Sequence, residues 1–225
     1  MVEAILSAYY ESVQPADACA ALDVTPDEAP GLRDLPAPHW VAPWGTESVE
    51  ERAWRTRLWA VKDGLSRTRL ATAKDGATAF GPVSARKLAL EVERTLKLAR
   101  SIRDKGYRAG AYDAPEVFGL RAGEDYRWFV IRGQHRLAAC AAAGIGTVAA
   151  RVTKIVRRED VGEWPHVVSG TYRVAGALKV FDRLFAGMPP VYAASWVERN
   201  RRPASPASAA LPGSATDATR TRSLT

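Results

Sequence analysis

The sequence predicts an α+β fold with short strands and longer amphipathic helices. Two segments rich in β-forming residues and a third alternating segment flank a glycine turn between residues 116 and 153. Amphipathic segments lie before this unit, at residues 84–105, and after it, at residues 174–185. The chain has 225 residues, of which 47% are hydrophobic and 25% charged, so it can form one full domain with extensions or two small domains.

Residues 1–79 are predicted to form a helical and irregular N-terminal arm. Residues 4–13 indicate a short helix, and residues 15–43 indicate an extended loop because they contain six prolines. Residues 48–65 indicate a second helix that begins at a Ser48 cap. Its apolar side chains recur at helical spacing and are expected to pack on the domain: Trp54, Leu58, Val61 and Leu65. Trp40 and Trp44 are expected to hold the arm on the domain by burial.

Residues 80–160 are predicted to form the central domain. Its first helix, at residues 84–105, ends before Gly106 and carries one apolar stripe: Leu88, Val92, Leu96, Ala99 and Ile102. A hairpin-like pair follows, with strands at 116–120 and 126–132 and a turn at 123–125. After Gly133, the pattern predicts a helix at 135–143 and another strand at 147–153.

Residues 161–200 are predicted to be a C-terminal helical extension. Its main helix has apolar side chains at helical spacing: Val174, Leu178, Phe181 and Phe185. Residues 201–225 are rich in Ala, Ser, Thr and Pro, with few large apolar side chains, so they are predicted to be a disordered tail.

The net charge of +7 is unevenly distributed along the chain. Residues 1–50 contain one arginine against nine acidic residues, whereas residues 51–200 contain 27 basic against 15 acidic residues. This excess indicates an anionic partner for the central segment, such as a nucleotide, a nucleic acid or a phosphorylated small molecule. Neutralisation between the acidic and basic parts of the chain is the alternative explanation.

Several classes of protein are disfavoured by composition. Two cysteines, Cys19 and Cys140, are too few for a disulfide scaffold or a four-cysteine zinc site, and they fit a reducing cytoplasm. The apolar runs are too short for a membrane span, and the N-terminus lacks a basic signal region. We therefore expect a cytoplasmic protein with no membrane partner and no bound structural metal.

The turn formed by residues 132–136 is the strongest candidate site. It joins a predicted strand to the start of a predicted helix, where backbone N–H groups and the positive end of the helix dipole meet. Arg136 adds a planar guanidinium suited to phosphate oxygens. These features predict an anion site, although many such turns contain a glycine and a basic residue without binding a ligand.

The run FVIRGQHRLAACAAAGI at residues 129–145, followed by VAARV at 148–152, resembles the core motif of the ParB N-terminal and sulfiredoxin-like superfamily. The upstream segment ARSIRDKG at residues 99–106 is similar to the end of a helix in that fold. This resemblance covers about residues 80–160. It implies a compact ParB-like domain with a small mixed sheet and packed helices, in which nucleotide phosphates lie on the loop and helix N-terminus after the motif glycine.

The resemblance also implies roles for individual residues. Gly133 matches the motif glycine, and Arg136 matches the arginine that contacts phosphate, with Gln134 and His135 between them. Gln134 occupies the position of the catalytic cysteine of sulfiredoxin, and an amide cannot act as a thiolate nucleophile, so sulfiredoxin chemistry is not expected. In partition proteins the motif is followed by an Asn-rich box and a helix-turn-helix domain. Here residues 154–160 read KIVRRED instead, which argues against site-specific partition on DNA. Further candidate site residues are Arg86, Arg132 and Glu116.

The function expected from these observations is the binding of a nucleotide or another phosphorylated ligand, with Mg²⁺ where the ligand is a nucleoside triphosphate. One alternative is a nucleic-acid-binding protein, acting in DNA partition or regulation. Its basic body interleaves aromatic and cationic residues: Trp44, Trp54 and Trp59 with Arg52, Arg55 and Arg57. Another is a nucleotide-dependent phosphotransferase or nuclease with Glu116 or His135 as base. A non-enzymatic interaction module is the third.

Overall fold

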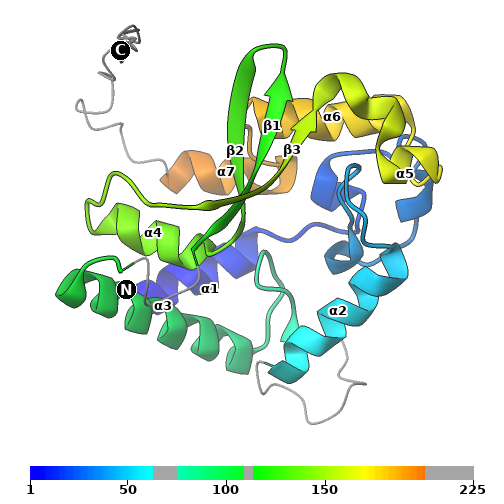
Figure 1. Ribbon diagram of the computed structural model, residues 1–225. Coiled ribbons are helices and arrows are strands. Elements are labelled where there is room, and N and C mark those ends of the chain that lie inside the picture. The colour runs from blue at the N-terminus through cyan, green and yellow to red at the C-terminus, as the bar shows by residue number, and fades with distance from the viewer. Residues whose placement is uncertain (63–74, 109–113, 201–225) are drawn as a thin grey trace, which may run out of the picture.

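A small mixed sheet lies between two groups of helices (Figure 1). The structure is a computed structural model, and it describes residues 1–62, 75–108 and 114–200. The helices are α1 (Val2–Ser12), α2 (Val49–Lys62), α3 (Ala85–Lys105), α4 (Gln134–Ala142), α5 (Pro165–Val168), α6 (Val174–Phe185) and α7 (Val191–Asn200). Short 3₁₀ segments are η1 (Ala20–Leu22), η2 (Pro30–Leu32), η3 (Ala37–His39) and η6 (Arg158–Glu163).

The sheet has the order β2-β1-β3, with β1 (Glu116–Ala122) in the centre. β1 pairs antiparallel with β2 (Asp125–Arg132) through a tight hairpin, as the sequence predicted. β1 also pairs in parallel with β3 (Arg151–Arg157), which follows α4 in the chain. The predicted α+β class with a small mixed sheet is therefore confirmed.

β3 begins at Arg151, later than the strand predicted from residue 147. The residues before it have another role, because Ile145 and Val148 pack against the buried side chains of Ile102 and Cys140. Some apolar residues of this segment therefore pack against α3 and α4, and the others lie in the strand.

The ends of two helices follow from capping residues that are visible in the sequence. The Ser84 hydroxyl accepts a hydrogen bond from the Lys87 amide at 3.1 Å, and α3 ends at Gly106 with a positive φ of 68°. Ser48 and Glu51 bond each other's backbone amides at the start of α2, in the reciprocal pattern of a capping box.

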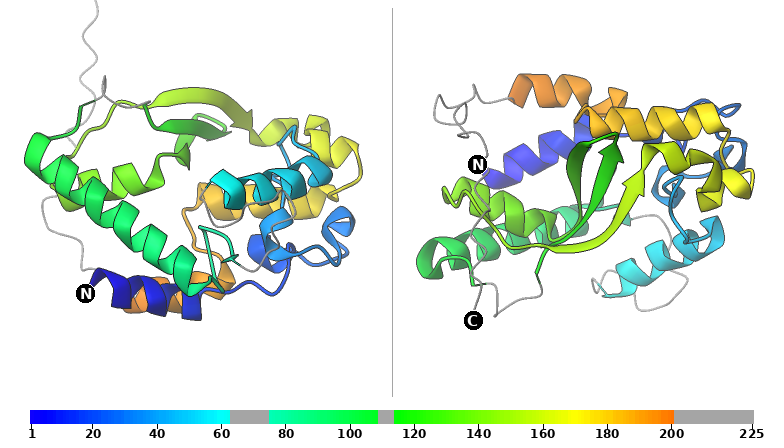
Figure 2. Two further views of the ribbon diagram at one scale, coloured as in Figure 1. Left: turned by 90° about the horizontal axis from the view of Figure 1, so that it is seen from below. Right: turned by 45° about the horizontal axis from the view of Figure 1, so that its top comes forward.

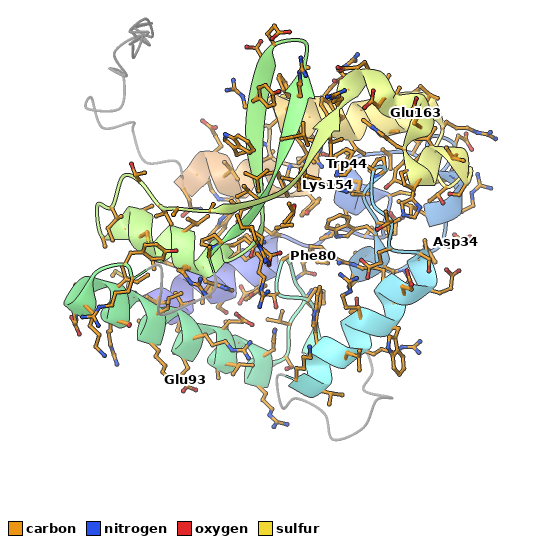
Figure 3. The ribbon with its side chains drawn as sticks, in the orientation of Figure 1. Asp34, Trp44, Phe80, Glu93, Lys154 and Glu163 are labelled. Carbon is orange, nitrogen blue, oxygen red and sulfur yellow. The ribbon has the colours of Figure 1, made fainter. Side chains whose placement is uncertain are left out.

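The main hydrophobic core is shared by the arm, the sheet and the C-terminal helices. The Trp44 ring contacts Phe118, Trp164 and Phe181, with centroids 5.8, 5.3 and 6.0 Å apart. Lys154 in β3 donates a hydrogen bond to the Trp44 carbonyl at 2.8 Å, and both residues are labelled in Figure 3. The prediction that Trp44 holds the arm on the domain is confirmed.

On the other side of the molecule, α3 packs against α4 and α1 (Figure 2). The predicted stripe of α3 is only half-buried, apart from Ile102. Two charged side chains of α3, Lys87 and Glu91, are at least as deeply buried as Ile102. The helix is therefore rotated from the orientation that its apolar residues alone would predict.

In α6 the buried side is also displaced from the predicted stripe. Phe181 is fully buried, but Val174 is exposed, and Ala177 and Val180 take the central core positions. In the parts of the chain that the structure describes, no helix is long and apolar enough to cross a bilayer. The predicted disordered tail, residues 201–225, and the predicted core position Leu65 lie outside the described residues.

Candidate functional site

The candidate site is built on Gly133, which connects β2 to α4, and on the first three residues of α4, Gln134, His135 and Arg136; these four residues are called the 133–136 loop. Gly133 is the N-cap of α4 and has φ +92°, a left-handed conformation that favours glycine. A Cβ at this position would lie 3.1 Å from the Pro115 Cβ, so the close packing also requires glycine. The Leu137 amide donates to the Gly133 carbonyl at 3.0 Å and starts the helix.

This geometry directs the first amides of α4 toward the outside of the helix end, where an intrahelical acceptor does not exist. No acidic side chain lies in the first turn of α4, and Gly133 provides no side-chain cap. His135 and Arg136 lie in that turn, with His135 exposed and Arg136 half-buried. The Gln134 side chain turns back and donates to the Val130 carbonyl at 3.4 Å. Arg136 therefore adds positive charge near the positive end of the helix dipole.

A buried ion pair lies on α3 next to this turn. The Lys87 Nζ is 2.7 Å from the Glu91 Oε1, and the two side chains are only 3% and 2% exposed. The other carboxylate oxygen, Glu91 Oε2, accepts no hydrogen bond from the described residues. His135 Nε2 lies 3.5 Å from that oxygen, and Arg94 lies 3.5 Å from Oε1. Glu91 thus connects α3 to the 133–136 loop through His135.

Lys87 and Glu91 were not predicted as site residues from the sequence. A lysine and a glutamate four residues apart on a helix usually form a solvated surface pair. Here α1 covers part of the helix, and Tyr10 from α1 is buried near Glu91. Burial, followed by the negative charge of Glu91, raises the pKa of Tyr10 well above its usual range. Only the tertiary packing identifies this cluster.

Glu116 forms a second charged group at the end of the sheet that leads into the 133–136 loop. Its carboxylate pairs with Arg132, at 3.3 Å, and with Arg151, its parallel partner across the sheet. The hydrogen bond from Arg151, with that from Arg132, lowers the pKa of Glu116 below its usual range. Glu116 is therefore held ionised by two arginines, which makes it a weak proton acceptor.

The structure brings Glu116 and Arg132 together and adds Arg151, which the sequence did not identify. Arg86 is exposed in the first turn of α3, one residue before Lys87. Successive helical residues point about 100° apart, so Arg86 projects from a different face of α3 than the Lys87 side chain. The described contacts connect Lys87 to the loop, because Lys87 pairs with Glu91 and Glu91 lies 3.5 Å from His135.

The tryptophans and arginines of the predicted nucleic-acid surface do not form one face. Trp44 is buried in the main core, whereas Trp54 and Trp59 on α2 are exposed. The expected packing of Trp54 into the domain is therefore wrong. The Arg52 guanidinium lies 4.9 Å from the Trp40 ring centroid and 5.2 Å from that of Trp59, and it also donates to the Pro38 carbonyl. Arg52 thus links α2 to η3 and Trp40 within the arm.

Two shallow surface depressions lie on the opposite side, next to α2. One, of ≈ 440 Å³, is lined by Thr46, Glu47, Glu51, Trp54, Arg55 and Leu58. The other, of ≈ 510 Å³, includes Glu50 and the buried His166 in its lining. Carboxylates contribute to both, so neither offers the positive potential that a phosphate requires. An anionic ligand is better matched by the 133–136 loop.

Comparisons with known proteins do not assign this site. A scan against protein-family models, a search of curated proteins and a search of solved structures each find no match to the chain. Among the residues that the structure describes, no three His, Cys, Asp or Glu side chains are grouped as a metal site. The functional argument therefore depends on the geometry and charge of the 133–136 loop.

Proposed function

We propose that the protein binds a nucleotide or another phosphorylated ligand at the 133–136 loop and the N-terminus of α4. The observation that carries this proposal is a rigid glycine turn that presents the start of a helix with His135 and Arg136 in its first turn and no acidic residue. The resemblance of this run to the ParB-like motif supports the same ligand class.

The electrostatics of the loop favour an anion. Cations near a helix N-terminus are opposed by the dipole, whereas a negative group there is stabilised. The start of α4 therefore favours a negative group beside the Arg136 guanidinium. Glu91 does not cancel this preference, because Lys87 neutralises it at 2.7 Å.

A phosphate group suits the loop better than a carboxylate does. A phosphate has several acceptor oxygens, so it can accept hydrogen bonds from the first-turn amides and from the Arg136 guanidinium at the same time. In a nucleoside triphosphate, Mg²⁺ would neutralise part of the remaining charge. The arginines at the end of the sheet, Arg132 and Arg151, add positive potential where β2 enters the loop.

The proposal is tested by screening the four nucleoside triphosphates for a thermal shift, with and without Mg²⁺, followed by calorimetric titration. A ligand at 100 times its Kd should stabilise the protein by about 2.7 kcal/mol. We expect Arg136→Gln to abolish this shift, while the control Arg100→Gln, an exposed position on α3, retains it. Equal affinity of the wild-type protein and Arg136→Gln would refute the assignment.

Phosphoryl transfer is a second candidate, favoured by the approach of Glu91 to His135. A histidine that is oriented by a buried carboxylate is a common arrangement for a general base. Glu116 is less suited, because its pKa is lowered by Arg151. If transfer occurs, His135→Gln should remove turnover but leave nucleotide affinity largely unchanged; unchanged turnover would eliminate this candidate.

A further inference from the structure

A second candidate surface lies on the sheet, away from the 133–136 loop. β1 and β2 form a hairpin that extends beyond α3 and α4, with α6 along one side of it (Figure 1). The side chains of Phe118 and Leu120 point into the main core beneath α6. Residues of the opposite parity along β1 therefore form the other face of the sheet, because side chains alternate along a strand.

The strand register defines this outer sheet face as two rows across the three strands. In the first row, Gly119 of β1 lies between Trp128 of β2 and Ile155 of β3. In the second row, Arg121 of β1 lies between Tyr126 of β2 and Arg157 of β3. The outer sheet face is thus composed of Gly119, Arg121, Tyr126, Trp128, Ile155 and Arg157.

The aromatic side chains of this face are exposed and mutually ordered. Tyr126 is 42% exposed and Trp128 57% exposed, and their rings stack with centroids 6.3 Å apart and planes 24° apart. A Cβ on Gly119 would lie 3.0 Å from the Trp128 Cζ3 and 2.6 Å from the Ile155 Cδ1. Because Gly119 has no side chain, the side chains of Trp128 and Ile155 can pack directly over β1.

Two arginines give the outer sheet face a positive charge. The Arg121 guanidinium lies 5.7 Å from the Tyr126 ring centroid and donates to the Gly123 carbonyl at 2.7 Å, which fixes its position. Arg157 is exposed beside it on β3. Arg121 pairs with Glu124 in the hairpin turn at 3.3 Å, and Glu124 is 96% exposed, so water screens this pair strongly. The six residues of the face include no carboxylate.

We propose that the outer sheet face binds single-stranded nucleic acid. Exposed stacked rings provide planar surfaces for unpaired bases of any sequence, and neighbouring arginines contact the phosphates between them. A protein partner would have to supply both apolar and acidic side chains to this face, whereas every single strand offers bases for the rings and phosphates for the arginines. The excess of basic residues between positions 51 and 200 favours the same polyanionic ligand.

The test is fluorescence anisotropy with fluorescein-labelled oligothymidylate and oligouridylate at low salt, with a DNA duplex for comparison. Single strands should bind more tightly than the duplex. Trp128→Ala should weaken their binding about tenfold or more, since stacking contributes roughly 1–3 kcal/mol per base. The matched control is Trp59→Ala, which removes another exposed tryptophan, 45% against 57% for Trp128, from α2 and should leave the affinity unchanged.

A second variant keeps the test independent of changes in folding. Arg157→Gln should reduce the slope of log affinity against log salt by about 0.7, the value expected for one lost contact with a single strand. The proposal is overturned if the wild-type protein binds no single strand at low salt, or if Trp59→Ala and Trp128→Ala weaken binding equally. It is also overturned if sedimentation shows a dimer that Trp128→Ala dissociates while oligonucleotides do not bind.

Discussion

The two sides of this molecule are held together by different interactions. Around Trp44 and Phe181 the core is aromatic and apolar, and it takes residues from the arm, the sheet and the C-terminal helices. Between α3 and α4 the buried apolar cluster is small, and the charged side chains of Lys87 and Glu91 on α3 are buried as deeply as Ile102. Apolar packing stabilises the first side, whereas the second places charge beside the 133–136 loop, where binding is proposed.

The largest expected effect comes from truncating the aromatic core. Phe181 is fully buried and contacts Trp44, Trp164 and Phe185, so Phe181→Ala should lower the free energy of unfolding by about 4 kcal/mol. Denaturant unfolding followed by tryptophan fluorescence measures this. The half-buried neighbour Phe185 is the control, and Phe185→Ala should cost clearly less. Equal losses would mean that the core is not centred on Phe181.

A somewhat smaller effect is expected on the charged side. Lys87→Met leaves the carboxylate of Glu91 buried without its lysine and should cost about 3 kcal/mol. Adding Glu91→Leu should recover most of this loss, because the uncompensated charge is then removed. Lys97→Met, at an exposed position of α3, is the control in the same unfolding measurement. If the double variant is no more stable than Lys87→Met, the pair does not act as a buried ion pair.

The loop glycine should have an intermediate effect. Gly133→Ala places a Cβ in a left-handed conformation and against Pro115, so we expect a loss of roughly 1–2 kcal/mol. Gly146→Ala is the matched control, since a Cβ there would meet no atom within 4 Å and φ is not positive. Thermal unfolding distinguishes them. A stable Gly133→Ala protein with unchanged ligand binding would show that the turn does not depend on glycine.

The smallest effect should come from the exposed arginine cluster at the end of the sheet. The lowered pKa of Glu116 means that its contribution is present above the usual glutamate range and is lost as pH falls through the lowered pKa. Glu116→Gln should lose this small contribution at neutral pH and should lack the acid-dependent loss, so that the variant and the wild-type protein converge in stability as pH falls. Unfolding midpoints measured from neutral to acidic pH test this, and identical pH profiles would contradict it.

The sequence predicted the elements that depend on local signals. The Ser48 cap of α2, the Gly106 end of α3 and the 123–125 turn are all present, because capping and turn residues act within a few positions. The glycine turn into α4 is also where the pattern placed it. The position of the candidate loop could therefore be predicted from Gly133 alone, without knowledge of the packing.

The features that depend on tertiary contacts could not be predicted in the same way. Val148 lies in a segment with a strand-like pattern, but it packs with Ile102 and Cys140. β3 therefore begins only at Arg151. The burial of Lys87 and Glu91 depends on how α1 and α4 cover α3, and periodicity of apolar residues carries no information about that. The outer sheet face likewise emerges only from register, which aligns Gly119 with Trp128 and Ile155.

The most direct test of the central proposal is an amide-resolved NMR titration of the ¹⁵N-labelled protein with the nucleotide that gives the largest thermal shift. Phosphate bound at the start of α4 should change the amide resonances of Gln134, His135 and Arg136 most strongly, because those N–H groups would donate to its oxygens. Saturable shifts centred on these three amides are the predicted result. Saturation with these amides unmoved, or with the shifts centred on α2, would contradict the assignment of the 133–136 loop as the phosphate site.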